Sequence, residues 1–236
     1  MKDNIFKDVY LGQNLAYLRP YICKKNPYQS KVFLTGINPA TPIYPGDVEF
    51  SKYLKIMESY NDFMNFYVEN RKKQNKPEIS RTRMGINSLV EWIENECGTG
   101  VVETDIFTYP TKNTKELLKI DNKVLNKSKE KFWQVLMEFK PDTIVLYGAL
   151  TVDTFKKLLK EKNQEVEFFD KNQECIEDLE KLYPFARINI DCKNIDVLAC
   201  RHLMYYGKER KEFWKLKTVY KKIGKYIERR WNGVII

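Results

Sequence analysis

The chain has 236 residues, 43% of them hydrophobic, and a formal net charge of +9 at pH 7. Its length fits one large domain better than two, and its hydrophobic content is sufficient for a proper core. The basic charge favours polyanionic partners such as nucleic acid, although charge by itself indicates attraction rather than specificity.

Several protein classes are excluded at this stage. The first eight residues have neither an apolar signal core nor a small-residue cleavage site, and no apolar run approaches the roughly 20 residues of a membrane span. The five cysteines include no C-x-x-C pair, so we expect no metal centre, no cofactor and no disulfide framework. We therefore expect a cytoplasmic protein that has no membrane partner and is a monomer.

Four short apolar or β-branched segments predict buried strands, and amphipathic patterns predict helices between them. In chain order these are strand 31–35, helices 50–73 and 86–97, strand 100–106, helix 128–139, strand 142–147, helix 150–162, strand 196–200 and helix 208–231. Strands that alternate with helices predict parallel pairing and an α/β fold.

The segment 164–194 does not fit this alternation. It contains two strand-like stretches, 166–169 and 187–190, on either side of a helical stretch at 174–182. We interpret it as a hairpin inserted in the last crossover of a single domain that spans residues 1–236.

The first predicted strand ends in Gly36-Ile37-Asn38-Pro39. Glycine allows a sharp turn and proline fixes the next backbone angle, so Asn38 is expected to be held at the carboxyl end of the strand. In an open parallel sheet this is where ligands bind. The alternative is an asparagine that only caps its own turn.

The other strands also end in conspicuous residues. The second strand ends at Asp105, the third at Tyr147-Gly148, and the fourth at Arg201-His202, which contains the only histidine of the chain. Polar groups at four strand ends on one edge of a sheet indicate a site.

These motifs, in this order, resemble those of the uracil-DNA glycosylase superfamily. The first is similar to the G-x-N-P-G form of the mismatch-specific and single-strand-selective branches. The stretch 105–112 resembles the second-strand region of the mismatch-specific branch. The stretch 140–148 resembles the third strand and its glycine exit. His202 falls where the second active-site motif, often H-P-S-P, would lie.

The resemblance implies a three-layer α/β/α fold with a central four-stranded parallel sheet. It also implies a monofunctional DNA glycosylase that removes uracil or a related modified pyrimidine after flipping it out of the DNA. Asn38 would orient a water molecule, and neutral His202 would donate to the departing base. The alternative is that His202 is a hydrogen-bonded structural histidine without a catalytic role.

The resemblance also suggests residues that bind the substrate. Gly36, Ile37, Pro39 and Asp105 would surround the base, and Phe50 would stack on it, with Tyr44 as the competitor for that role. Either aromatic could instead belong to the core.

DNA contacts are expected after the histidine. Leu203 or Met204 would enter the minor groove, and Lys208, Arg210 and Lys211 would contact phosphates. The apolar pair could instead form a staple at the start of the last helix.

The chain also departs from the superfamily pattern. Ala40 replaces the last glycine of the first motif, Asp105 lies where several branches have a base-reading asparagine, and Pro-Ser is missing after His202. Two other hypotheses therefore stay open. One is an idle superfamily member that binds nucleic acid or a protein. The other is a small-molecule enzyme on a similar sheet, which the absence of a G-x-G-x-x-G loop disfavours.

Overall fold

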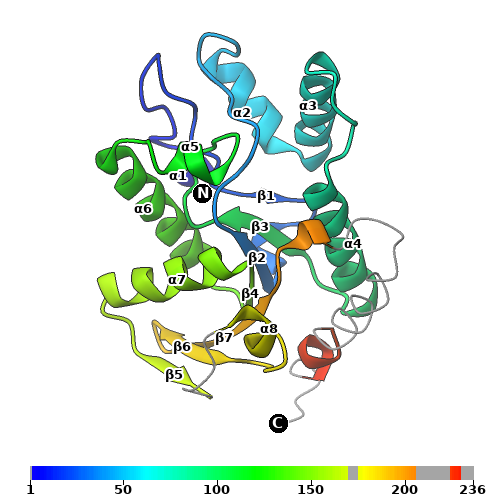
Figure 1. The fold of residues 1–236 in the computed structure, drawn as a ribbon, viewed down its shortest axis with the longest axis vertical. Helices are drawn as coiled ribbons and strands as arrows, with labels where there is room; N and C mark the ends of the chain where they lie inside the picture. The colour runs from blue at the N-terminus through cyan, green and yellow to red at the C-terminus, as the bar shows by residue number, and fades with distance from the viewer. Residues whose placement is uncertain (1, 170–174, 206–223, 230–236) are drawn as a thin grey trace.

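The computed structural model describes residues 2–169, 175–205 and 224–229 of the chain (Figure 1). They form a mixed α/β fold around one seven-stranded sheet of order β1-β3-β2-β4-β7-β6-β5. The strands are β1 (Ile22–Cys23), β2 (Val32–Gly36), β3 (Val101–Asp105), β4 (Thr143–Tyr147), β5 (Val166–Phe168), β6 (Ala186–Ile190) and β7 (Lys193–Cys200).

The sheet is wider than the expected four strands, and it is mixed. Strands β3, β2, β4 and β7 lie side by side in parallel pairs. The short strand β1 adds an antiparallel neighbour to β3, and β6 and β5 add two antiparallel strands beyond β7. Since an unpaired sheet edge exposes backbone donors and acceptors, such edge strands satisfy groups that four strands alone would leave open.

The register of the parallel strands brings their carboxyl ends together. Gly36 pairs with Asp105, and Tyr147 pairs with Cys200. The loops that follow these four strands therefore leave the sheet at one edge, which is the usual ligand edge of a parallel α/β sheet.

Side chains of the inner strands alternate between two faces, as a pleated strand requires. Phe33 faces a cluster with Phe132 and Phe155, on helices α6 (Asn122–Phe139) and α7 (Ala149–Glu161). Leu34 faces the other side, where it joins a cluster with Leu89 on α4 (Arg81–Glu96). The sheet is thus covered by helices on both faces (Figure 1).

A third cluster lies between the N-terminal segment and two helices, α2 (Phe50–Glu58) and α3 (Tyr60–Lys73). The sequence predicted one helix over 50–73, which is wrong because Ser59 is extended. The Ser59 side chain accepts a hydrogen bond from the Asp62 backbone N–H and so caps a new helix.

The starts of α4 and α6 are earlier than predicted for a similar reason. The side chains of Ser80 and Asp121 cap the first turns of these helices at positions where the apolar pattern is not yet visible. The remaining elements are short: α1 (Lys2–Ile5), η1 (Pro27–Gln29), α5 (Thr114–Leu117), α8 (Ile176–Leu179) and η2 (Leu203–Tyr205).

The segment 164–194 contributes β5, α8 and β6 among its described residues, and β6 pairs with both β5 and β7. It therefore extends the main sheet. Of the predicted helix 208–231, the structure describes only 224–229, which are helical. Within the described ranges, no helix is both long and apolar enough to cross a membrane.

The 3₁₀ turn η2, which follows the histidine, is packed directly on α4 (Figure 1). The close approach depends on Gly85 in the middle of α4, because a Cβ atom there would collide with the carbonyl oxygen of Leu203. A helix-interior glycine otherwise costs about 1 kcal/mol relative to alanine. The close contact with Leu203 explains why a glycine stands at position 85 in spite of this cost.

We predict that Gly85→Ala destabilises the protein by roughly 1–3 kcal/mol, the usual cost of overpacking, despite the better helix propensity of alanine. Urea unfolding would measure the change. Gly46→Ala is the control, since nothing lies within 4 Å of the added Cβ. A Gly85→Ala protein as stable as the wild type would show that Leu203 is not held by this contact.

Candidate functional site

A cavity of about 350 Å³ opens at the carboxyl ends of the parallel strands. Five of the predicted site residues line it: Ile37, Asn38, Pro39, Asp105 and His202. Asn38 and His202 follow β2 and β7, which are separated by β4 in the sheet. The fold therefore brings the carboxamide and the only imidazole of the chain to one cavity, as the sequence predicted.

The Asn38 side chain is held by the loop that follows β3. Its Nδ2 donates to Thr111 Oγ1 at 2.8 Å and to the Pro39 carbonyl at 3.3 Å. The Thr111 hydroxyl in turn donates to the Asn113 carbonyl at 2.8 Å. Both amide hydrogens thus have acceptors, which leaves Oδ1 as the acceptor that Asn38 can offer to the cavity.

The His202 ring has a defined tautomer. Its Nδ1 accepts a hydrogen bond from the Met204 backbone N–H at 3.2 Å, so the proton of the neutral ring belongs on Nε2. Burial lowers the pKa of His202 below its usual value. The ring also meets Tyr147 edge to face at 5.7 Å. His202 is therefore a neutral donor at neutral pH.

The inserted segment contacts the residue before this histidine. Glu180, at the end of α8, accepts a hydrogen bond from Arg201 Nε at 2.7 Å, and its side chain is only 6% exposed. The Arg201 side chain is 34% exposed, so the pair is buried on the Glu180 side only. The segment 164–194 thus helps to fix the backbone from which His202 projects.

Two arginines and two carboxylates form the polar base of the cavity. Arg83 pairs with Glu103 at 2.5 Å, and Arg19 lies 3.9 Å from Asp105. Burial opposes the charge of Arg83, but Glu103, Tyr60 and Tyr147 together outweigh this effect and raise the pKa of the guanidinium. Burial raises the pKa of Asp105 to about 7, against the opposing charges of Arg19 and Arg83.

Gly36 has a different role from the one predicted. It is not part of the cavity lining, but a Cβ atom on it would collide with Tyr147 Oη and Asp105 Oδ1. Glycine is therefore needed so that these two oxygens can approach the end of β2. It makes room for the polar groups without contacting a ligand.

The prediction that Phe50 or Tyr44 stacks on a base in the cavity is wrong, because neither residue lines the cavity. Phe50 begins α2 and packs with Tyr17 at 5.8 Å and Tyr10 at 6.4 Å. Tyr44 lies on a neighbouring groove. The spacing from Asn38 gave no information on where the intervening loop would fold.

The aromatic residues that do line the cavity are Tyr21, Tyr67 and Tyr147. Tyr67 has the helical spacing of a core residue, and Tyr147 ends a strand. Nothing in the sequence around Tyr21 indicated a site.

The prediction that Leu203 enters the minor groove of DNA is wrong. Its side chain is fully buried between α4 and the sheet, so it is a core residue. Met204 is 41% exposed and Tyr205 is 61% exposed. Lys208, Arg210 and Lys211 lie outside the described residues.

Sequence reasoning also missed Arg19, Arg83 and Glu103. Glu103 carried a usable signal, since a carboxylate in the middle of a strand predicted to be buried needs a partner. Arg83 and Arg19 stand in stretches with no strand-end pattern, and only the fold brings them under the cavity.

Among the described residues, no cluster of three or more His, Cys, Asp or Glu side chains could hold a metal ion. Comparisons with protein-family models and with curated proteins gave no match to this chain.

The only imidazole of the chain permits a direct test of the His202 geometry. We predict that ¹⁵N NMR of histidine-labelled protein shows the Nε2–H tautomer and a pKa below 6.5, because burial disfavours the charged ring. A pKa at or above 6.5, or an Nδ1–H tautomer, would contradict the arrangement.

The raised pKa of Asp105 predicts that this residue contributes to the free energy of unfolding in a pH-dependent way. A carboxyl with a raised pKa binds its proton more tightly in the folded protein, so its stabilising effect is complete below about pH 4 and is lost as the pH rises through about 7. Relative to Asp105→Asn, the wild type should lose roughly 1–3 kcal/mol over this interval. Urea unfolding from pH 4 to 8 measures it.

The matched control is Asp153→Asn, at an exposed position on α7. Its stability relative to the wild type should change little over the same pH range. If Asp105→Asn and Asp153→Asn show the same pH dependence, Asp105 has an ordinary pKa.

Proposed function

We propose that the protein is a monofunctional DNA glycosylase that hydrolyses the N-glycosidic bond of uracil or a related modified pyrimidine. The observation that carries the proposal is the shared cavity of Asn38 and His202. Its volume of about 350 Å³ is within the range of small-ligand sites, roughly 300–1,000 Å³. A flipped nucleotide is a ligand of this size class.

His202 is suited to stabilise the departing base. Cleavage of the glycosidic bond leaves negative charge on the base, and a fixed donor aimed at a base carbonyl oxygen lowers the energy of that anion. The Nε2–H group of His202 is such a donor, since Met204 holds Nδ1 as the acceptor. The neutral ring donates this proton in a hydrogen bond and keeps it.

Asn38 is suited to orient the attacking water. Its amide hydrogens are directed at Thr111 and Pro39, so Oδ1 can accept a hydrogen bond from a water molecule near the sugar carbon. A carboxamide cannot take up the proton as a carboxylate would. Stabilisation of the leaving base would therefore supply most of the rate enhancement.

Asp105 is the group suited to read the base. It replaces the asparagine expected from the superfamily pattern, and it lines the same cavity. An ionised carboxylate only accepts hydrogen bonds, whereas a protonated one also donates. With a pKa of about 7, Asp105 would favour different bases on the two sides of neutrality.

The fold supports the proposal at a coarser level. The four inner strands pair in parallel, and the sheet carries helices on both faces. Both features agree with a three-layer α/β/α fold built on a central four-stranded parallel sheet. In this interpretation β1, β5 and β6 are additions to that sheet.

A second function is favoured by two specific observations. Both predicted stacking aromatics lie outside the cavity lining, and Leu203 is buried in the core. These are the parts that a glycosylase of this type uses to extract a base from duplex DNA. The alternative is therefore an inactive member of the superfamily that binds nucleic acid or a protein partner.

Incubation with single-stranded and duplex oligonucleotides that carry uracil opposite G or A, followed by detection of abasic sites, tests the proposal. We predict base release that falls roughly 10²–10³-fold in His202→Ala, the usual cost of removing such a donor. Asn38→Ala should also lose activity. Circular dichroism would verify that both variants are folded.

Lys160→Gln, on the exposed face of α7, is the control and should release base at the wild-type rate. Binding of oligonucleotides without any abasic product would instead support the inactive member. Equal activity of the wild type and His202→Ala would exclude the proposed role of the imidazole.

A further inference from the structure

A groove of about 530 Å³ adjoins the cavity. Its walls are the loop 40–48 and the carboxyl-terminal half of α3, with Lys112 from the loop after β3. Four residues line both spaces: Ala40, Thr41, Arg71 and Lys112. The cavity and the groove therefore lie next to each other along these four residues.

The groove is basic. It is lined by four cationic side chains, Arg71, Lys73, Lys76 and Lys112, and by two carboxylates, Asp47 and Glu69. Within the described ranges, none of the four cations forms an ion pair with a carboxylate. The lining thus carries two more positive than negative side chains, and such an excess of positive charge complements a phosphodiester backbone.

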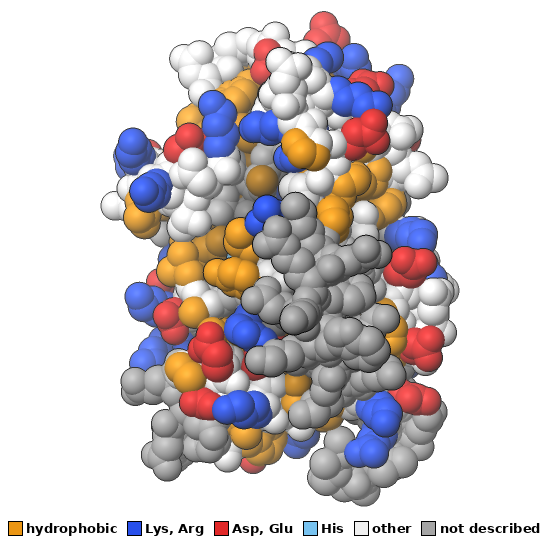
Figure 2. Space-filling model, turned by 45° about the vertical axis from the view of Figure 1, so that its right-hand side comes forward, with side chains coloured by type: hydrophobic (Ala, Val, Ile, Leu, Met, Phe, Trp, Pro, Cys, Tyr) orange, Lys and Arg blue, Asp and Glu red, His pale blue; other side chains and the backbone are white. Residues whose placement is uncertain are grey.

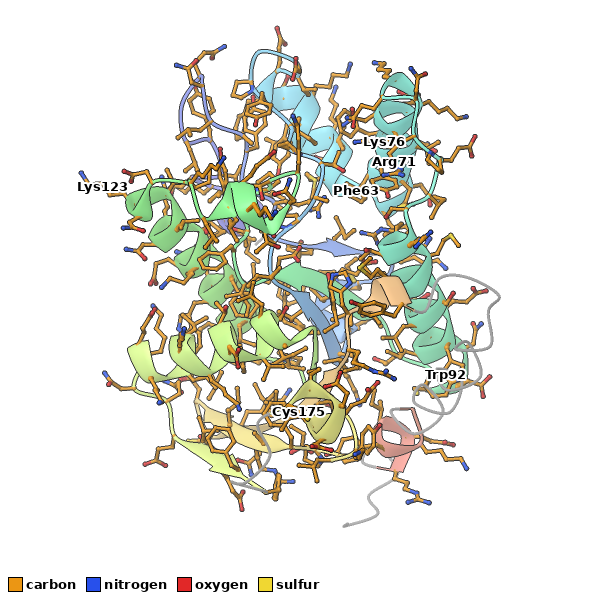
Figure 3. All side chains as sticks on the ribbon, in the orientation of Figure 1. Phe63, Arg71, Lys76, Trp92, Lys123 and Cys175 are labelled. Carbon is orange, nitrogen blue, oxygen red and sulfur yellow. The ribbon has the colours of Figure 1, made fainter. Side chains whose placement is uncertain are left out.

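Figure 3 shows where two of these cations lie. Arg71 and Lys76 are together at α3, far from Lys123 at the opposite side (Figure 3). On the face drawn in Figure 2, Lys and Arg side chains occur in both the upper and the lower part of the described surface, mixed with Asp and Glu side chains.

The groove also carries an aromatic ring. Tyr44 is 38% exposed and lines the groove together with Pro42 and Phe66. A cationic groove with an accessible aromatic ring is the usual design for single-stranded nucleic acid, since any base can stack on such a ring. This position gives Tyr44 a role that differs from the one predicted.

The junction between cavity and groove has an unusual backbone. Thr41 has a φ of 75°, which is rare for a β-branched residue and carries a cost in free energy. The preceding carbonyl, of Ala40, accepts a hydrogen bond from Arg19 Nη1 at 3.2 Å. The loop is thus held in a strained conformation by the polar base of the cavity, and strain of this kind is often kept at functional sites.

We propose that the groove binds the nucleotide adjacent to the one in the cavity, on the same single strand. Its base stacks on Tyr44, and the phosphate that joins the two nucleotides lies at Arg71 and Lys112. Lys73 and Lys76 contact the next phosphate. The inference rests on the proposed function for the identity of the first nucleotide, and it predicts a preference for single-stranded DNA.

Fluorescence anisotropy with a labelled oligothymidylate that contains no uracil tests the groove without any need for base release. We expect Tyr44→Ala, and separately the double variant Lys73→Gln/Lys76→Gln, to weaken binding about tenfold at low salt. Because both lysines contact one phosphate, their removal should also reduce the slope of log Kd against log salt concentration by about 0.7.

The double variant Lys123→Gln/Lys160→Gln is the matched control, because it removes the same charge from exposed positions on α6 and α7. It should bind like the wild type. Equal weakening in both double variants would mean that only net charge matters, and the groove proposal would be wrong. A protein that binds no oligothymidylate would overturn it as well.

Ligand length and type separate this inference from the proposed function. Thymidine dinucleotides should compete more strongly than mononucleotides, and Tyr44→Ala should remove the difference. If that holds but no base is ever released, the groove stands and the glycosylase proposal fails. If base is released and dinucleotides have no advantage, only the groove proposal fails. Equal competition by an acidic peptide would also reject it.

Discussion

The parallel register of β3, β2, β4 and β7 is the constraint on which the site depends. It aligns Gly36 with Asp105 and Tyr147 with Cys200, so the loops that carry Asn38 and His202 leave the sheet at the same edge. The absence of a side chain on Gly36 lets Asp105 and Tyr147 approach the end of β2. A shift of one residue in any of these strands would turn the buried side chains to the wrong face, so the apolar core and the site specify the same register.

Beneath this edge, four charged side chains are nearly buried. The Arg83–Glu103 pair is nearly buried, and Arg19 lies beside Asp105. A buried ion pair contributes little net stability, because desolvation offsets most of the attraction. Removal of one partner is costly, so the groups form one interdependent arrangement. Burial raises the pKa of Asp105 to about 7 against the charges of Arg19 and Arg83, and Arg19 also supports the loop at Ala40. The same charges therefore influence both the cavity and its junction with the groove.

Much of the fold and part of the site could be predicted. The four inner strands were visible as short apolar runs, and their ends indicated Asn38, Asp105 and His202 because parallel strands share a ligand edge. The break between α2 and α3 was not visible, since one capping serine interrupts a continuous apolar pattern. Leu203 was misassigned because an exposed ligand-facing side chain and a core side chain have the same spacing in the sequence. Phe50 and Tyr44 are exposed, and they were misassigned because their spacing from Asn38 does not show where the intervening loop folds.

The sequence by itself determined the α/β class, the buried strands and the residue types that the site contains, because hydrophobic periodicity and turn residues act over short distances. Only the tertiary structure decided which of those residues meet. Arg19, Tyr67 and Arg83 reach the cavity from segments with no local signal, and Leu203 is buried by a glycine more than one hundred residues earlier in the chain. These contacts are made between segments that are far apart in the sequence. A local sequence pattern does not show which distant surface a segment will pack against.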